Sequence, residues 1–251
     1  MSLPIGLQLF SIKDETAKDF AGTLKKVAEI GYEGVEFAGY GGLKSHELKA
    51  VMQDLNLKAC GSHVGLNELV NDLAAVIDYN LEIGNPYIIC PWSELNNIKE
   101  CEELALKLNT IGEKCKKEGL ILGYHNHNHE FKQINSKYLL DILYEETKSE
   151  YVKAEIDTYW VEYSGVNAIE YMKKYTGRVE LVHMKDMEIV NGEKRSTEIG
   201  NGIIDIKAIA AEAENIGVKW LIVEQEYFRG STIESVKLGY ENLKKLIRGE
   251  R

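Results

Sequence analysis

The sequence predicts a single α/β domain, a closed (β/α)₈ TIM barrel that spans residues 1–251. Three observations support this fold class. Apolar runs of strand length alternate with helical segments from end to end, which is typical of parallel strands joined by crossover helices. The alternation gives eight units, the number that closes a barrel of about 250 residues. No glycine-rich phosphate turn follows the first run, where an open doubly wound sheet usually carries one.

The expected strands are short and largely apolar. In chain order they cover residues 5–10, 34–37, 58–62, 87–90, 120–125, 152–157, 179–183 and 220–224. Apolar residues at steps of three and four predict helices that include residues 20–30, 48–55, 104–111 and 206–213. Several helical segments end in glycine, which accepts the left-handed conformation that closes a helix. These glycines are Gly31, Gly84, Gly119 and Gly217.

Composition narrows the class of function. The net charge of −10 argues against a general electrostatic grip on nucleic acid. The first residues have no basic lead and no window holds about 18 unbroken apolar residues, so we expect neither a signal peptide nor a membrane span. No C-x-x-C pair occurs, and we expect free thiols and a cytoplasmic protein. The four cysteines are Cys60, Cys90, Cys101 and Cys115.

Four residues in the second half of the chain stand where strands end: His125, Asp157, His183 and Glu224. Because the carboxyl ends of parallel strands meet at one face of a barrel, these side chains are expected to lie together. Two imidazoles and two carboxylates form a ligand set that suits one divalent transition metal. Mn²⁺ and Zn²⁺ fit this set best, and Co²⁺, Mg²⁺ and Fe²⁺ are also compatible with it.

The segment YHNHNHEF carries three histidines at alternate positions, 125, 127 and 129. His125 lies nearest the barrel and is therefore the predicted ligand. His127, Asn128 or Glu130 is then expected to support the metal ligands or to contact substrate. The alternative is a polar, hydrogen-bonded loop that holds no metal.

Each of the two predicted carboxylate ligands has a glutamate two residues away in the sequence, which would point to the same side of an extended strand. Asp157 alone fits a helix cap, and Glu155 two residues earlier is a candidate for a charge inside the barrel. Glu224 follows three apolar strand residues, where a carboxylate is costly unless it is paired or bound to metal. Glu226 is the less buried alternative.

Lys185 lies two residues after His183 and in phase with it. An ammonium beside a metal stabilises an enolate or alkoxide oxygen. The other interpretation pairs Lys185 with Asp186 or Glu188 on the surface.

Polar and aromatic residues near other strand ends suit a sugar ring, which has apolar C–H faces and many hydroxyls. Trp92 and Trp160 are candidates for aromatic walls, and Gln8, Glu36 and His63 for the polar rim. Two glycine clusters follow expected strands. Residues 39–42 are interpreted as a plain turn, whereas residues 200–202 fit either a turn or backbone close to a ligand.

The strings LKKVAEIGYEGVEFAG, GYHNHNHEF, LVHMKD and IVEQE carry a resemblance that runs essentially from end to end. The chain resembles the xylose-isomerase-like TIM barrels, which include sugar isomerases and epimerases, inosose dehydratases and endonuclease-IV-type enzymes. The YHNH-x-HEF and HMKD strings resemble a subgroup described as sugar phosphate isomerase/epimerase-like. The resemblance implies a metal site at the ends of strands five to eight, which corresponds to His125, Asp157, His183 and Glu224.

One departure bears on the reaction. Ketose epimerases of this superfamily use a glutamate at the end of strand five, and it works with the strand-eight glutamate on opposite faces of the substrate. Here that position holds His125. The resemblance therefore favours elimination or dehydration beside a metal-polarised carbonyl of a keto-sugar or keto-cyclitol over two-carboxylate epimerisation. The candidate catalytic groups are Glu224, His127, Glu130 and Lys185.

Two other functions compete with this metal-dependent isomerase or lyase. One is a metal-dependent phosphodiesterase like the endonuclease-IV-type members, which the acidic net charge disfavours. The other is a non-catalytic sugar-binding barrel or partner subunit. The expected partner is a small-molecule sugar or cyclitol, with no nucleic acid and no membrane, and the sequence leaves the oligomeric state open.

Overall fold

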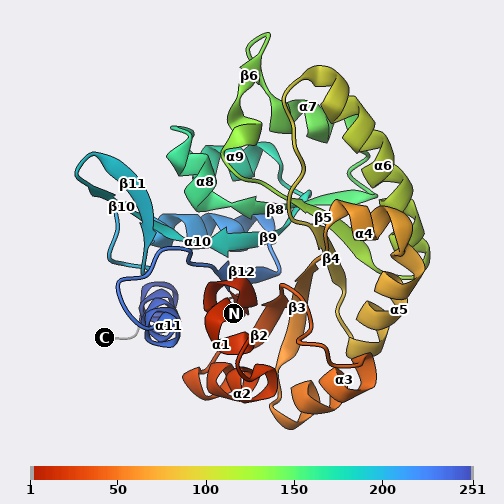
Figure 1. The fold of residues 1–251 in the computed structure, drawn as a ribbon. Helices are drawn as coiled ribbons and strands as arrows, with labels where there is room; N and C mark the ends of the chain where they lie inside the picture. Colours follow the sequence, from red (N-terminus) through yellow and green to blue (C-terminus); the bar gives the residue numbers. More distant parts are fainter. Residues whose placement is uncertain (1–2, 250–251) are drawn as a thin grey trace.

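A computed structural model describes residues 3–249 of the chain. Within them, eight parallel strands close into a barrel in the order β1-β12-β9-β8-β5-β4-β3-β2, which confirms the predicted fold class (Figure 1). The strands are β1 (Ile5–Gln8), β2 (Gly34–Phe37), β3 (Lys58–His63), β4 (Tyr87–Cys90), β5 (Ile121–His125), β8 (Val152–Asp157), β9 (Val179–Met184) and β12 (Trp220–Val223). Residues 1, 2, 250 and 251 of the predicted domain lie outside the described residues.

Helices surround the barrel (Figure 1). The predicted helical segments correspond to α2, α3, α6 and α10, and glycine closes α2 and α10 with positive φ angles of 113° at Gly31 and 86° at Gly217. The helices are α1 (Lys13–Thr16), α2 (Phe20–Ile30), α3 (Ser45–Asp54), α4 (Leu66–Asn71), α5 (Leu73–Ile83), α6 (Ile98–Lys117), α7 (Leu139–Glu146), α8 (Thr158–Tyr163), α9 (Ala168–Lys174), α10 (Ile206–Ile216) and α11 (Thr232–Arg248).

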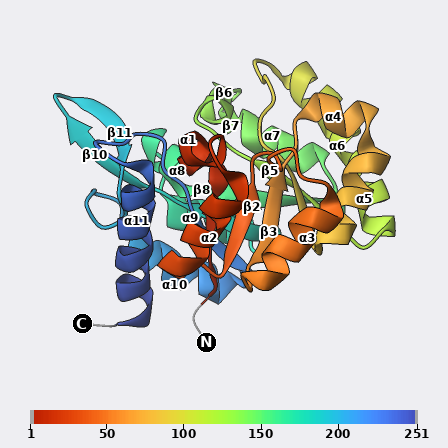
Figure 2. The same cartoon turned by 60° about the horizontal axis from the view of Figure 1, so that its bottom comes forward.

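The structure differs from the expected elements in three places. The first strand ends at Gln8, because the Gln8 side chain accepts the N–H of Phe10 and starts a 3₁₀ turn, η1 (Leu9–Ile12). Two short hairpins were not expected. One pairs β10 (Asp186–Val190) with β11 (Glu193–Thr197) and projects from the barrel (Figures 1 and 2). The other pairs β6 (Gln133–Ile134) with β7 (Lys137–Tyr138).

The barrel interior is divided between apolar and polar side chains. An apolar cluster fills part of the interior with residues from β3, β4, β9 and β12: Cys60, Tyr87, Ile89, Leu181, Trp220 and Ile222. Polar side chains from the same barrel, such as Glu36 and Glu155, are also fully buried. All four cysteines are buried free thiols. No helix within residues 3–249 has the length and apolarity needed to cross a membrane.

Two helical glycines provide a test of the packing around the barrel. A Cβ added at Gly112 in α6 would lie 2.2 Å from the carbonyl oxygen of Tyr151, whereas one at Gly239 in α11 would meet Val223 at an ordinary 3.4 Å. Gly112→Ala is therefore expected to destabilise the protein by about 1–3 kcal/mol, despite the better helix propensity of alanine. Gly239→Ala, the matched control, is expected to stabilise it by up to about 1 kcal/mol. Urea unfolding measures both, and equal shifts would contradict the packing described here.

Candidate metal centre

The four side chains predicted as metal ligands lie together at the carboxyl ends of β5, β8, β9 and β12. The pairing of β8 with β9 sets Asp157 opposite His183. The Nε2 atom of His125 lies 3.6 Å from Oδ2 of Asp157, and Nδ1 of His183 lies 3.2 Å from Oε2 of Glu224. One ligand atom from each of the four residues lies within 4.8 Å of the others, and all four residues are buried. We call this group the outer cluster.

The surroundings of the His125 ring are those expected of a metal ligand. Nδ1 of His125 lies 3.4 Å from the carbonyl oxygen of Pro91, which favours the tautomer with a free lone pair on Nε2. That Nε2 atom is buried and has no hydrogen-bond partner among residues 3–249. A buried nitrogen lone pair without a donor is costly, and a divalent cation would satisfy it.

Lys185 is fully buried between carboxylates. Its Nζ lies 3.1 Å from Oε2 of Glu224, 3.4 Å from Oδ2 of Asp157 and 3.0 Å from Oε1 of Glu226. The rings of Tyr159 and Trp160 flank it, each with its centroid 5.0 Å from Nζ. The alternative of a surface pair with Asp186 or Glu188 is therefore wrong, because this ammonium points into the site.

The charge of Lys185 sets the protonation of its neighbours. Burial raises the pKa of Asp157, but the adjacent Lys185 ammonium and the His125 imidazole together outweigh burial and keep that pKa below its usual value. Lys185, followed by His183, likewise holds the pKa of Glu224 well below its usual range against the effect of burial. Both carboxylates are therefore ionised, as metal ligands must be.

Asp186, next to Lys185, closes the loop that follows the β10–β11 hairpin. Its carboxylate accepts N–H groups of Met187, Gly200, Gly202 and Ile204 at 2.8–3.1 Å. The glycines of residues 200–202 thus bind a carboxylate of the same chain. In the other glycine cluster, Gly41 and Gly42 lie in a turn after β2, as interpreted from the sequence.

The histidine-rich segment places His127 beside the outer cluster, whereas the Glu130 side chain lies outside that cluster. Burial, with a contribution from His125, lowers the pKa of His127 to about 3, and its buried Nδ1 has no partner within residues 3–249. Glu130 is fully buried and accepts the hydroxyl of Tyr124 at 3.0 Å and the N–H of His127 at 2.9 Å. The structure does not bring Glu130 into the outer cluster, so His125 is the β5 residue positioned to bind metal.

A cavity of about 410 Å³ opens beside the outer cluster, a size within the usual range for small-molecule sites. Phe10, Pro91 and Trp92 provide an apolar side, and Trp92 is half exposed. The predicted wall residue Trp160 is not a lining residue; its ring lies 5.7 Å from that of His127. The lining residues are Phe10, Ala38, His63, Pro91, Trp92, His125, His127, Glu224 and Glu226.

Two residues expected on the polar rim lie deeper than expected. Gln8 and Glu36 are fully buried, and the Gln8 amide donates to Glu36 at 2.7 Å, so neither reaches the cavity.

His63 lines the cavity, and its Nε2 atom contacts Glu155 and Glu36. Burial would lower the pKa of His63, but these two carboxylates outweigh it and raise the pKa to about 10. Glu155 is a charge inside the barrel, as its phase with Asp157 indicated.

Comparisons with known proteins agree with this fold. A family model described as xylose isomerase-like TIM barrel matches residues 24–246. An inosose dehydratase of Clostridium botulinum (strain Alaska E43 / Type E3) is 34% identical over 146 residues, which cover 52% of this chain and 48% of that protein. The chain thus spans about half the length of the curated relatives it matches.

Two solved structures share the fold. A sugar phosphate isomerase/epimerase from Parabacteroides distasonis ATCC 8503 gives a TM-score of 0.85 at 23% identity, with 98% of this chain and 96% of that chain covered. An IolI protein with a binding zinc atom gives a TM-score of 0.79 at 14% identity, with 98% and 99% covered. At these identities the likeness establishes the architecture alone.

Proposed function

Because the chain belongs to the xylose isomerase-like TIM barrel family, we propose that it is a metal-dependent enzyme acting on a ketone-bearing sugar or cyclitol. The observation that carries the proposal is the outer cluster. It combines two imidazoles and two ionised carboxylates with an unpartnered Nε2 on His125, beside a cavity with an apolar side. The names of the similar proteins, inosose dehydratase and sugar phosphate isomerase/epimerase, support this substrate class.

We propose elimination of water or another leaving group as the reaction, rather than epimerisation by two carboxylates. The position at the end of β5 holds His125, and Glu130 is engaged by Tyr124 and the backbone of His127. The carboxylates among the described lining residues are Glu224 and Glu226, both from the segment after β12, and Glu226 pairs with Lys185 at 3.0 Å. The lining therefore includes no carboxylate from β5. The relatives that act as inosose dehydratases support the same choice.

Each group of the site has a proposed role. His125, Asp157, His183 and Glu224 would hold a divalent ion, which supplies Lewis acidity toward a carbonyl when bound. Lys185 keeps Asp157 and Glu224 ionised and in place. His127 and Glu224 line the cavity and are the candidates to accept the proton beside the carbonyl. Trp92 and Phe10 offer an apolar surface to the C–H face of a ring.

Turnover in D₂O tests this function. Metal-loaded protein is incubated with a ketose and, separately, with a keto-inositol or a 3-keto-glycoside. We expect elimination product from the second class, together with deuterium exchange at the carbon beside the carbonyl of that substrate. His127→Ala should lower that rate about 10²–10⁴-fold if His127 is the base. Chelator-treated protein is the control, and efficient epimerisation of the ketose without turnover of the others would overturn the proposal.

A further inference from the structure

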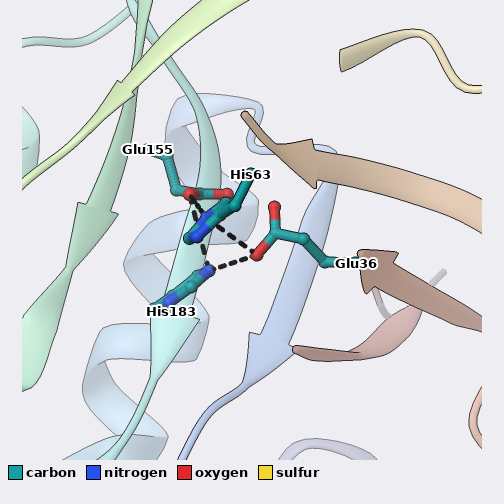
Figure 3. Close-up of side chains that lie close together, drawn as sticks. All are labelled: Glu36, His63, Glu155 and His183. Atoms are coloured by element: carbon teal, nitrogen blue, oxygen red, sulfur yellow. Dashed lines mark hydrogen bonds and ion pairs between the residues drawn. The ribbon is translucent and has the colours of Figure 1, made fainter. Parts of the chain in front are cut away.

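A second group of metal-ligating side chains lies deeper in the barrel. Glu36 from β2, His63 from β3, Glu155 from β8 and His183 from β9 point toward one another (Figure 3). One ligand atom from each lies within 4.8 Å of the others. Glu36, Glu155 and His183 are fully buried, and the His63 side chain is 11% exposed. We call this group the inner cluster; it shares His183 with the outer cluster.

The distances within the inner cluster are close to those of a tetrahedral site. Nε2 of His63 lies 2.8 Å from Oε2 of Glu155 and 3.2 Å from Oε2 of Glu36. Nε2 of His183 lies 2.7 Å from Oε2 of Glu36 and 3.5 Å from Oε2 of Glu155. Ligand atoms about 2.0–2.1 Å from a tetrahedral ion are about 3.3 Å apart, so shifts of a few tenths of an ångström would admit one.

Two oxygen atoms of the inner cluster lack any donor. Oε1 of Glu36 and Oε1 of Glu155 are buried and have no hydrogen-bond partner among residues 3–249. Burying a carboxylate oxygen without a hydrogen-bond donor costs free energy. The two imidazoles contact the Oε2 atoms and therefore do not offset this cost for the Oε1 atoms. A carboxylate that chelates a cation uses both of its oxygens, so a cation chelated by Glu36 and Glu155 would engage these Oε1 atoms as well as the Oε2 atoms.

The neighbouring strand leaves space for one of these oxygens. A Cβ at residue 61 of β3 would lie 2.2 Å from Oε1 of Glu36, so any side chain there would displace the carboxylate. Glycine at this position keeps Glu36 directed at His63 and His183. The arrangement of the inner cluster thus depends on the backbone of β3 as well as on its four side chains.

We propose that the inner cluster is a second divalent transition-metal site, joined to the outer one through His183. When both sites are filled, His183 bridges the two ions as an imidazolate, and its remaining ring proton is released to solvent. The two ring nitrogens of His183 face opposite ways, with Nδ1 toward Glu224 and Nε2 toward Glu36. The mixed imidazole and carboxylate set matches that of the outer cluster, so the same class of ion suits both. His63 reaches the cavity, which gives the ion an entry path.

Metal stoichiometry tests the second site. Protein stripped with chelator is dialysed against saturating Mn²⁺ and, in parallel, Zn²⁺, and bound metal is counted by elemental analysis. We expect two ions per chain in the wild type. One ion is expected after Glu155→Gln, which alters the inner cluster alone, and one after Asp157→Asn, which alters the outer cluster alone. His183→Asn should weaken both sites.

Controls separate this result from loss of the fold. Glu180→Gln, on the same strand as His183 but outside both clusters, should retain two ions. Glu36→Gln repeats the test at the inner cluster, and circular dichroism identifies any variant that fails to fold. In the Mn²⁺ protein, a spin-coupled electron paramagnetic resonance signal should disappear with Glu155→Gln.

The outcomes also distinguish this site from the proposed function. A wild type that binds one ion, lost with Asp157→Asn and kept with Glu155→Gln, would overturn the second site and leave the proposed enzyme intact. A wild type that binds no ion would overturn both.

Discussion

Replacing Asp157 by alanine is expected to remove the ion of the outer cluster and to lower turnover of a keto substrate by about 10³-fold or more. The estimate follows because a metal that polarises a carbonyl contributes several kcal/mol to the barrier, and each 1.4 kcal/mol is about tenfold in rate. The remaining ligands, His125, His183 and Glu224, lack the second carboxylate that balances the charge of the ion. Metal content and steady-state rates, both compared with wild type, measure the effect.

Asp157 also caps a helix, which calls for a matched control. Its Oδ1 accepts the N–H of Trp160 at 3.1 Å, and loss of such a cap costs about 1 kcal/mol of stability. Asp19 caps α2 in the same way, by accepting the N–H of Gly22 at 2.9 Å, and lies outside the site. Asp19→Ala should cost similar stability and keep full metal content. A variant at Asp157 with the metal content of the wild type would show that the ligand assignment is wrong.

Lys185→Met is expected to destabilise the protein by about 3–5 kcal/mol, the usual cost of leaving buried charge without its partner. Asp157 and Glu224 are nine-tenths buried or more, and both lose the ammonium that lies 3.1–3.4 Å from them. Urea unfolding measures the loss. It should be larger in chelator than with bound divalent metal, because the metal would still neutralise these carboxylates.

A surface lysine provides the comparison for this effect. Lys173 pairs with Glu170 at 3.0 Å, but the two side chains are 46% and 71% exposed. Lys173→Met should therefore change stability by less than about 1 kcal/mol. Similar losses for Lys173→Met and Lys185→Met would mean that the carboxylates around Lys185 rearrange or take up protons when it is removed.

The barrel and the outer cluster were predictable because the relevant pattern is local. Each apolar run fixes a strand, parallel strands end at one face, and a polar residue at the end of a run must lie there. His125, Asp157, His183 and Glu224 follow this rule. Their proximity needed no knowledge of tertiary contacts beyond the closure of the barrel, whereas their role in binding metal stays a prediction.

How deeply each polar side chain lies inside the barrel was not predictable in the same way. Glu36 lies one residue before the end of β2, and nothing in its own strand indicates that Gly61 and Gln8 hold it inward. The partners of Lys185 were equally hidden, since its three carboxylates come from β8 and from the segment after β12. Alternation along one strand gives the direction of a side chain, and its partners depend on strands distant in the sequence.

The four backbone N–H groups that surround the Asp186 carboxylate affect how much the β10–β11 hairpin can change in length. They tie the residue after Lys185 to the loop at residues 200–204, so the base of the β10–β11 hairpin is closed independently of its tip. Lengthening a surface loop costs only about 0.6 kcal/mol for each doubling. The turn at Asn191 and Gly192 can therefore be lengthened at a small cost in stability. Insertions at the hairpin tip are therefore expected to leave the position of Lys185 unchanged.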